Sequence, residues 1–141
     1  MVFRANSSAG SATFTIEGAR NGFASGGLAF FRDAASAGDA TINLKAAAPG
    51  ISFGSGGGAT FVGDSTAGNA TITTEQGTNF RLTGNADLGT ARVTVVGNAN
   101  ANNASGTVMT FGDSASAANG TIKGAGRDRR RILRGGGHLR Q

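Results

Sequence analysis

The residues of this sequence that could do acid–base or metal chemistry are few and widely spaced. Asp33, Asp64 and Asp113 each stand two or three places after a phenylalanine. Stacked carboxylates of this kind could bind Ca²⁺, or act as an acid and a base on a carbohydrate. The calcium nonapeptide G-G-x-G-x-D-x-U-x is not matched, however, and no Trp or Tyr is present to form an aromatic platform for a sugar. We therefore interpret these aspartates as turn-forming residues.

Other catalytic and cofactor-binding arrangements lack their components. His138 is the only histidine and the chain has no cysteine, so neither a Ser-His-Asp triad nor a zinc site can be assembled. The Gly-rich stretches 54–58 and 135–137 lack the G-x-x-x-x-G-K-S/T spacing of a phosphate-binding loop. The sequence thus predicts no catalytic residue, no metal site and no cofactor, and the protein is not expected to be an enzyme.

An internal repeat covers most of the chain. Five segments share an apolar residue, a short polar turn, a small residue six places on and an A-T-I-like sequence after it. The segments are FRANSSAGSATFTI (3–16), FRDAASAGDATINL (31–44), FVGDSTAGNATITT (61–74), LTGNADLGTARVTV (82–95) and FGDSASAANGTIKG (111–124). A repeat of this length is typical of a solenoid, in which each unit packs on the next.

The interval between the third and fourth segments is shorter than the others. The missing residues correspond to a Gly-rich insert that is present at 23–30 and 53–60. Inserts of variable length at one point of a repeat are expected of loops on one face of a solenoid. We expect the inserts around residues 20–30, 49–60 and 97–108 to carry any contacts with other molecules.

The end of each segment alternates between apolar and polar residues, which is the period of a β-strand. If the units stack in register, four columns of like side chains point inward. These columns are Phe3/Phe31/Phe61/Leu82/Phe111, Ala9/Ala37/Ala67/Leu88/Ala117, Ala12/Ala40/Ala70/Ala91/Gly120 and Phe14/Ile42/Ile72/Val93/Ile122. The sequence therefore predicts an all-β domain over residues 1–124, a parallel β-helix or solenoid of about five coils with three short strands each.

Stacking also predicts polar columns on the surface. Ser11, Asp39, Asn69, Thr90 and Asn119 share one turn position and could hydrogen-bond from coil to coil. Two outward rows are rich in threonine, namely Thr13/Thr41/Thr71/Arg92/Thr121 and Thr15/Asn43/Thr73/Thr94/Lys123. A flat threonine ladder on a β-solenoid resembles the ice-binding face of some antifreeze proteins, so ice binding is one alternative function, although exposed strands favour threonine in any case.

The excess positive charge lies at the C-terminal end. The net charge is +5, yet residues 1–126 hold equal numbers of basic and acidic side chains, and the excess belongs to RDRRRILRGGGHLRQ (127–141). We expect residues 125–141 to form a disordered Arg/Gly-rich tail. The alternatives are translation of a shifted reading frame, binding of a polyanion and binding of anionic lipid at a membrane surface. Nucleic acid is not the expected partner, because the tail has no Phe, Trp or Tyr between its arginines. Because only about one fifth of the residues are Leu, Ile, Val or Phe, a disordered low-complexity protein is a further alternative.

The pattern of FVGDSTAGNATITT (61–74) is similar to the repeats of bacterial autotransporter passengers. This resemblance covers roughly residues 3–124 and implies a right-handed β-helix that is secreted and displayed at the cell surface, beyond the outer membrane. The implied function is structural or adhesive, with host or neighbouring-cell surface components as partners and no catalytic residues to carry over. This chain shows no signal peptide, membrane barrel or transmembrane segment, so the resemblance implies a fragment of a passenger. Unpaired strands at the open coil ends are a possible route to self-association.

Overall fold

The computed structural model describes residues 1–51, 54–97 and 106–125, and these residues form an all-β parallel solenoid. Five coils follow one another, each with two strands, and β1 to β9 are separated by four complete turns. The strands are β1 (Val2–Phe3), β2 (Thr13–Ile16), β3 (Leu28–Phe31), β4 (Thr41–Leu44), β5 (Gly58–Phe61), β6 (Thr71–Thr74), β7 (Asn79–Leu82), β8 (Arg92–Val96), β9 (Val108–Phe111) and β10 (Thr121–Ala125). The described residues are therefore an ordered solenoid rather than a disordered polypeptide.

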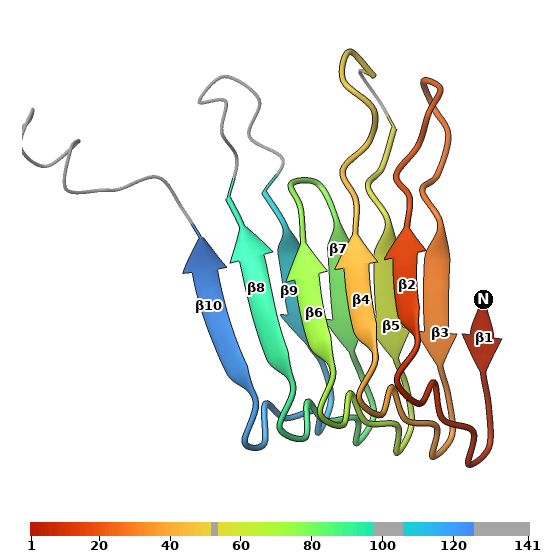
Figure 1. Cartoon of the computed structure of the whole chain (residues 1–141), viewed down its shortest axis with the longest axis vertical. Helices are drawn as coiled ribbons and strands as arrows, with labels where there is room; N and C mark the ends of the chain where they lie inside the picture. Colours follow the sequence, from red (N-terminus) through yellow and green to blue (C-terminus); the bar gives the residue numbers. More distant parts are fainter. Residues whose placement is uncertain (52–53, 98–105, 126–141) are drawn as a thin grey trace, which may run out of the picture.

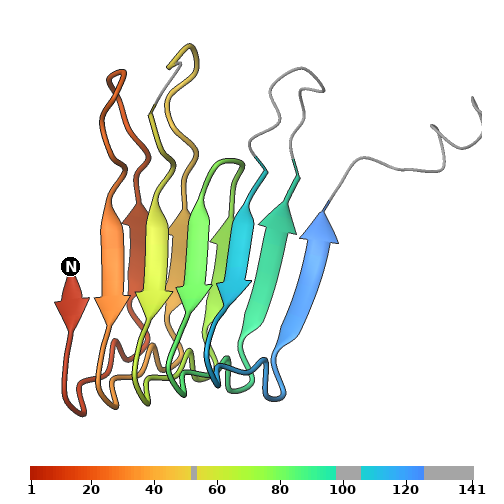
Figure 2. The ribbon, with the colours of Figure 1, turned by 180° about the vertical axis from the view of Figure 1, so that it is seen from behind.

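The strands form two parallel sheets that face each other. The first sheet has the order β1-β3-β5-β7-β9 and the second has the order β2-β4-β6-β8-β10. Figures 1 and 2 show the chain descending through the first sheet, crossing at the lower edge and ascending through the second. This path is right-handed, as expected when parallel neighbours in one sheet are joined by a crossover. Within the described ranges no helix is long and apolar enough to cross a membrane.

The prediction of three strands per coil is wrong in detail. The third ladder consists of single bridging residues, Ser8, Ser36, Thr66, Asp87 and Ser116. Two columns of left-handed residues flank it, namely Ala5/Asp33/Gly63/Gly84/Asp113 and Gly10/Gly38/Gly68/Gly89/Ala118, all with positive φ. Because the chain turns at both columns, too few residues lie between them for a full strand.

The predicted in-register stacking is confirmed. Phe14, Ile42, Ile72, Val93 and Ile122 are successive partners in the second sheet, and Phe3, Phe31, Phe61, Leu82 and Phe111 are partners in the first. The rings of Phe3, Phe31 and Phe61 stack almost parallel, with centroids 4.6 and 4.5 Å apart. In the middle coils the side chains of these columns are fully buried, as are Ala37, Ala67 and Leu88. Small alanine columns at the turns let the coil close around this narrow core.

The predicted Gly-rich inserts are only partly loops. Leu28–Phe31 and Gly58–Phe61 are strands, and Ala29, Ala59 and Phe80 form a buried column that the partly buried Met109 continues. The described residues that connect successive coils are 17–27, 45–51 with 54–57, 75–78, and 97 with 106–107. The loop 17–27 and the turn 75–78 lie at the upper edge in Figure 1. The short spacing arises because 75–78 closes the coil in a single tight turn.

The predicted domain boundary lies close to the end of the last strand. β10 ends at Ala125, one residue past the predicted limit at 124. The remainder of the predicted tail, residues 126–141, lies outside the described residues.

A charge placed in the central apolar column is expected to unfold the solenoid. Ile72 is fully buried between Ile42 and Val93, so Ile72→Asp would bury an unpaired carboxylate. Thr71→Asp is the matched control, because Thr71 lies on the same strand and faces solvent. Far-UV circular dichroism and thermal melting should show loss of the β spectrum for I72D and a change within about 0.5 kcal/mol for T71D. An unchanged melt for I72D would contradict the column assignment.

A methyl group at the turn glycines should cost more inside the stack than at its end. Gly10 and Gly68 have nearly the same φ, 60° and 62°. A Cβ on Gly10 would meet nothing within 4 Å, whereas a Cβ on Gly68 would lie 2.8 Å from the carbonyl oxygen of Gly38. Gly10→Ala should therefore lose about 1 kcal/mol from backbone strain alone, and Gly68→Ala clearly more. Equal losses in chemical denaturation would show that the close approach of the coils is not limiting.

Candidate functional site

The three aspartates singled out by their spacing do not come together. Asp33 and Asp113 share one column but belong to the second and fifth coils, and glycines occupy that column in between. Asp33 Oδ2 accepts a hydrogen bond from the Ala5 amide at 2.9 Å, and Asp113 Oδ2 accepts one from the Gly84 amide at 3.0 Å. Each carboxylate thus caps the turn of the preceding coil, while both residues adopt left-handed conformations that aspartate tolerates.

Asp64 has a similar structural contact in the neighbouring column. Its Oδ1 accepts a hydrogen bond from Asn85 Nδ2 at 2.9 Å, which joins the third coil to the fourth. The geometry therefore agrees with the interpretation of these aspartates as turn-forming residues. Among the described residues no group of three or more histidine, cysteine or acidic side chains is placed to hold a metal ion.

Polar side chains of the turns also bond from coil to coil, as their stacking predicts. Asn69 Nδ2 donates to Asp39 Oδ1 at 3.0 Å, and Thr90 Oγ1 in turn donates to Asn69 Oδ1. In the bridge column Thr66 Oγ1 donates to Asp87 Oδ1 at 2.6 Å. The ionisable groups in these ladders serve to join coils and do not converge on a common point.

One ion pair was missed from the sequence. Lys45 Nζ and Glu75 Oε1 lie 2.7 Å apart, and Glu75 Oε2 accepts a hydrogen bond from the Ala46 amide at 3.0 Å. The hydrogen bond from Lys45 is the main cause that lowers the pKa of Glu75, and the same contact raises the pKa of Lys45. Lys45 directly follows β4 and Glu75 directly follows β6, so the two residues occupy the same position of neighbouring repeats. Alignment of the repeats could therefore have indicated this pair from the sequence. The pair ties the loop 45–57 to the tight turn 75–78.

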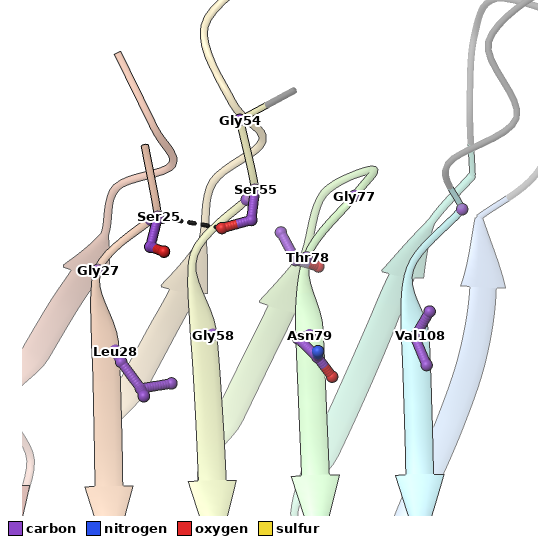
Figure 3. Close-up of a pocket in the computed structure, with 13 residues that line it drawn as sticks. Ser25, Gly27, Leu28, Gly54, Ser55, Gly58, Gly77, Thr78, Asn79 and Val108 are labelled. Carbon is purple, nitrogen blue, oxygen red and sulfur yellow. Dashed lines mark hydrogen bonds between the residues drawn. The ribbon is translucent and has the colours of Figure 1, made fainter. Parts of the chain in front are cut away.

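A groove opens at the foot of the loops on the first sheet, with a volume of about 730 Å³. Figure 3 shows that it runs across successive coils, and its floor is mainly glycine. The Gly26 amide donates to Ser55 Oγ at 3.0 Å, which is the bond drawn there. The glycines are required by close approach, since a Cβ on Gly26 would lie 2.3 Å from the Gly56 carbonyl oxygen and one on Gly56 2.7 Å from that of Gly77.

The groove offers shape and hydrogen bonds rather than acid–base chemistry. Its polar side chains are Ser25, Ser55, Thr78 and Asn79, and no ionisable side chain is among its lining residues. Leu28 and Val108 supply apolar contact at the two ends of the groove. Sequence reasoning interpreted these glycines as loop residues only, because close packing between coils is a tertiary property.

The threonine rows lie on the outer face of the second sheet, in the predicted register. Thr13, Thr41 and Thr71 are consecutive partners, and the row is then interrupted by Arg92 before Thr121. The second row is interrupted by Asn43 and Lys123. Uninterrupted threonine therefore spans only part of the face. His138, the glycines 135–137 and the basic segment 127–141 lie outside the described residues.

Comparisons with known proteins give no match from which a function could be transferred. Neither a protein-family model, nor a curated protein, nor a solved structure matches this chain at a significant level.

The Lys45–Glu75 ion pair predicts a small, pH-dependent contribution to stability. The pKa of Glu75 in the folded state lies below its ordinary value of 4.5, so this contribution is complete above that value and is lost as the pH falls through the folded-state pKa. Glu75→Gln should thus lower the melting temperature slightly at neutral pH, since exposed pairs contribute little. The melting curves of the two proteins should converge in acid. A difference that persists at low pH would assign the effect to packing instead of charge.

Proposed function

We propose that this chain is a non-catalytic structural or adhesive module, and that it belongs to a surface-displayed, autotransporter-like passenger. The observation that carries the proposal is that the polar side chains form hydrogen bonds and an ion pair between coils. The aspartates, asparagines and the ion pair of the described residues bond from one coil to the next, which favours a rigid spacer over a reactive centre.

The loops at the upper edge are the best candidates for contact with a partner. Three of the four coil-to-coil connections are long, whereas 75–78 shows that the coil can close in one turn. The extra length is therefore not needed to build the solenoid. The groove lies at the foot of these loops and includes Ser25, Gly26 and Gly27 of the first loop, so a bound polymer could contact both features at once.

The loop 17–27 is the most suitable segment for a test. It connects the first two coils, so only one neighbouring loop stacks on it, and Glu75-Gln76-Gly77-Thr78 can replace it as a connection already proven in the same solenoid. The chimera should keep its β spectrum by circular dichroism and lose binding to immobilised glycans and to extracellular-matrix proteins. Thr13→Ala, on the outer face of the second sheet, is the control that should leave binding unchanged. Full binding by the folded chimera would contradict the role assigned to the loop.

The parentage of the chain is tested separately, by reading the coding DNA on both sides in all frames. Further F-x-x-x-x-x-A-G-x-A-T-I coils, with a secretion signal and a membrane barrel, would support the passenger assignment. Their absence in every frame would overturn it and leave the rigid solenoid as a module of another kind.

A further inference from the structure

The two ends of the solenoid carry apolar faces built on the same template. At the C-terminal end Phe111 and Ile122 are 38% and 44% exposed, although their counterparts Phe61 and Ile72 in the third coil are fully buried. At the N-terminal end Phe3 and Phe14 occupy the same two columns and are only partly buried. Each end face thus has the side chains of a coil-to-coil interface but lacks, among the described residues, the neighbouring coil that covers these side chains inside the solenoid.

The backbone groups at the two ends are complementary and in register. At the last internal junction the Ser116 amide donates to the Ala86 carbonyl at 3.1 Å, and the Thr121 amide donates to the Ala91 carbonyl at 2.9 Å. One coil further on, the corresponding carbonyls are those of Ala115 and Gly120, which accept no hydrogen bond from the described residues. The corresponding amides of the first coil belong to Ser8 and Thr13, and these donate to no described residue.

We propose that the first coil of one copy stacks on the fifth coil of a second copy, head to tail, and so continues the solenoid across the junction. We choose a second copy as the partner because its first coil has the same repeat pattern as the coils that cover each internal coil. Ser8 would then donate to Ala115 and Thr13 to Gly120, while Phe3 covers Phe111 and Phe14 covers Ile122. The proposal does not depend on the adhesive role of the loops, and it applies to the chain of 141 residues, since further coils of a longer passenger would cover the same two faces.

The side chains raise no objection to this junction. Asp113 and Lys123, the charged residues of the last described turn and strand, would face Ala5 and Thr15, so no like charges meet between the described residues of the two ends. Stacking of this kind is heterologous, because each end binds the opposite end of the next copy, and it produces an open row of molecules rather than a closed dimer. The full chain should therefore associate progressively as its concentration rises.

Two prolines can block the ends one at a time without touching the core. In each end strand, every second residue forms backbone hydrogen bonds with the neighbouring strand, β4 for β2 and β8 for β10. Thr15 and Gly124 lie between these residues, so their amides point away from the solenoid. The Thr15 side chain is exposed, and a Cβ on Gly124 would meet nothing within 4 Å. Thr15→Pro and Gly124→Pro should each weaken association of the full chain by about tenfold or more, whereas Thr15→Ala and Gly124→Ala should associate as the unchanged protein does.

Mixing the two proline variants distinguishes head-to-tail stacking from a symmetric dimer. In sedimentation velocity each variant alone should be a monomer, and the mixture should give a one-to-one dimer that does not grow. A variant that dimerises alone would show pairing of like ends and overturn the proposal. A monomeric full chain at every concentration would also overturn it.

Cysteine cross-linking provides a measurement that does not depend on the prolines. Side chains of the bridge column approach within bonding distance between coils, as Thr66 and Asp87 do at 2.6 Å, and the native chain has no cysteine. A Ser8→Cys/Ser116→Cys variant should form a ladder of disulfide-linked oligomers under mild oxidation. Ser8→Cys/Ser114→Cys, which is out of register, should not. Equal cross-linking of both variants would contradict the proposed register.

Discussion

In-register stacking of parallel strands is the constraint on which the rest of this structure depends. With coils about 4.8 Å apart, each side chain lies directly on the residue at the same position of the next coil. Each residue must therefore pack well on the residues at the same position of the neighbouring coils. Phenylalanine rings meet this requirement by stacking face to face, as Phe3, Phe31 and Phe61 do. Asparagine, threonine and aspartate meet it by bonding along the column.

The same constraint explains why so few large side chains suffice. The interior holds only a narrow layer between two facing sheets, and alanine fills the positions where the chain turns. One imperfection stands out in this layer. Ser65 is fully buried in a column that has alanine at Ala35 and Ala86, and its Oγ has no hydrogen-bond partner among the described residues. An alanine methyl group would fill the same space as the Ser65 hydroxyl without leaving a polar atom unpaired.

The stacking also limits what the protein can do and where it can do it. Among the described residues, Asp33, Asp64 and Asp113 and the Lys45–Glu75 pair each bond to a neighbouring coil, and they lie at separate points along the solenoid. Freedom to vary remains at the upper edge, where loop length does not disturb the ladder, and at the two ends, where the ladder stops. A partner for the solenoid is therefore sought at its loops, in the glycine-floored groove or at its ends.

The repeat alone determined the parallel solenoid, its register and four of its inward columns, because a stacked fold converts sequence periodicity directly into contacts. It also determined that Asp33, Asp64 and Asp113 are turn residues, which follows from their place in the template. Only the tertiary structure decided that residues 28–31 and 58–61 are strands, since Gly58 and Ala59 resemble loop residues until Phe80 is seen to extend their buried column. The Lys45–Glu75 pair and the groove were likewise decided by tertiary structure, because they depend on how loops of unequal length fold back over neighbouring coils.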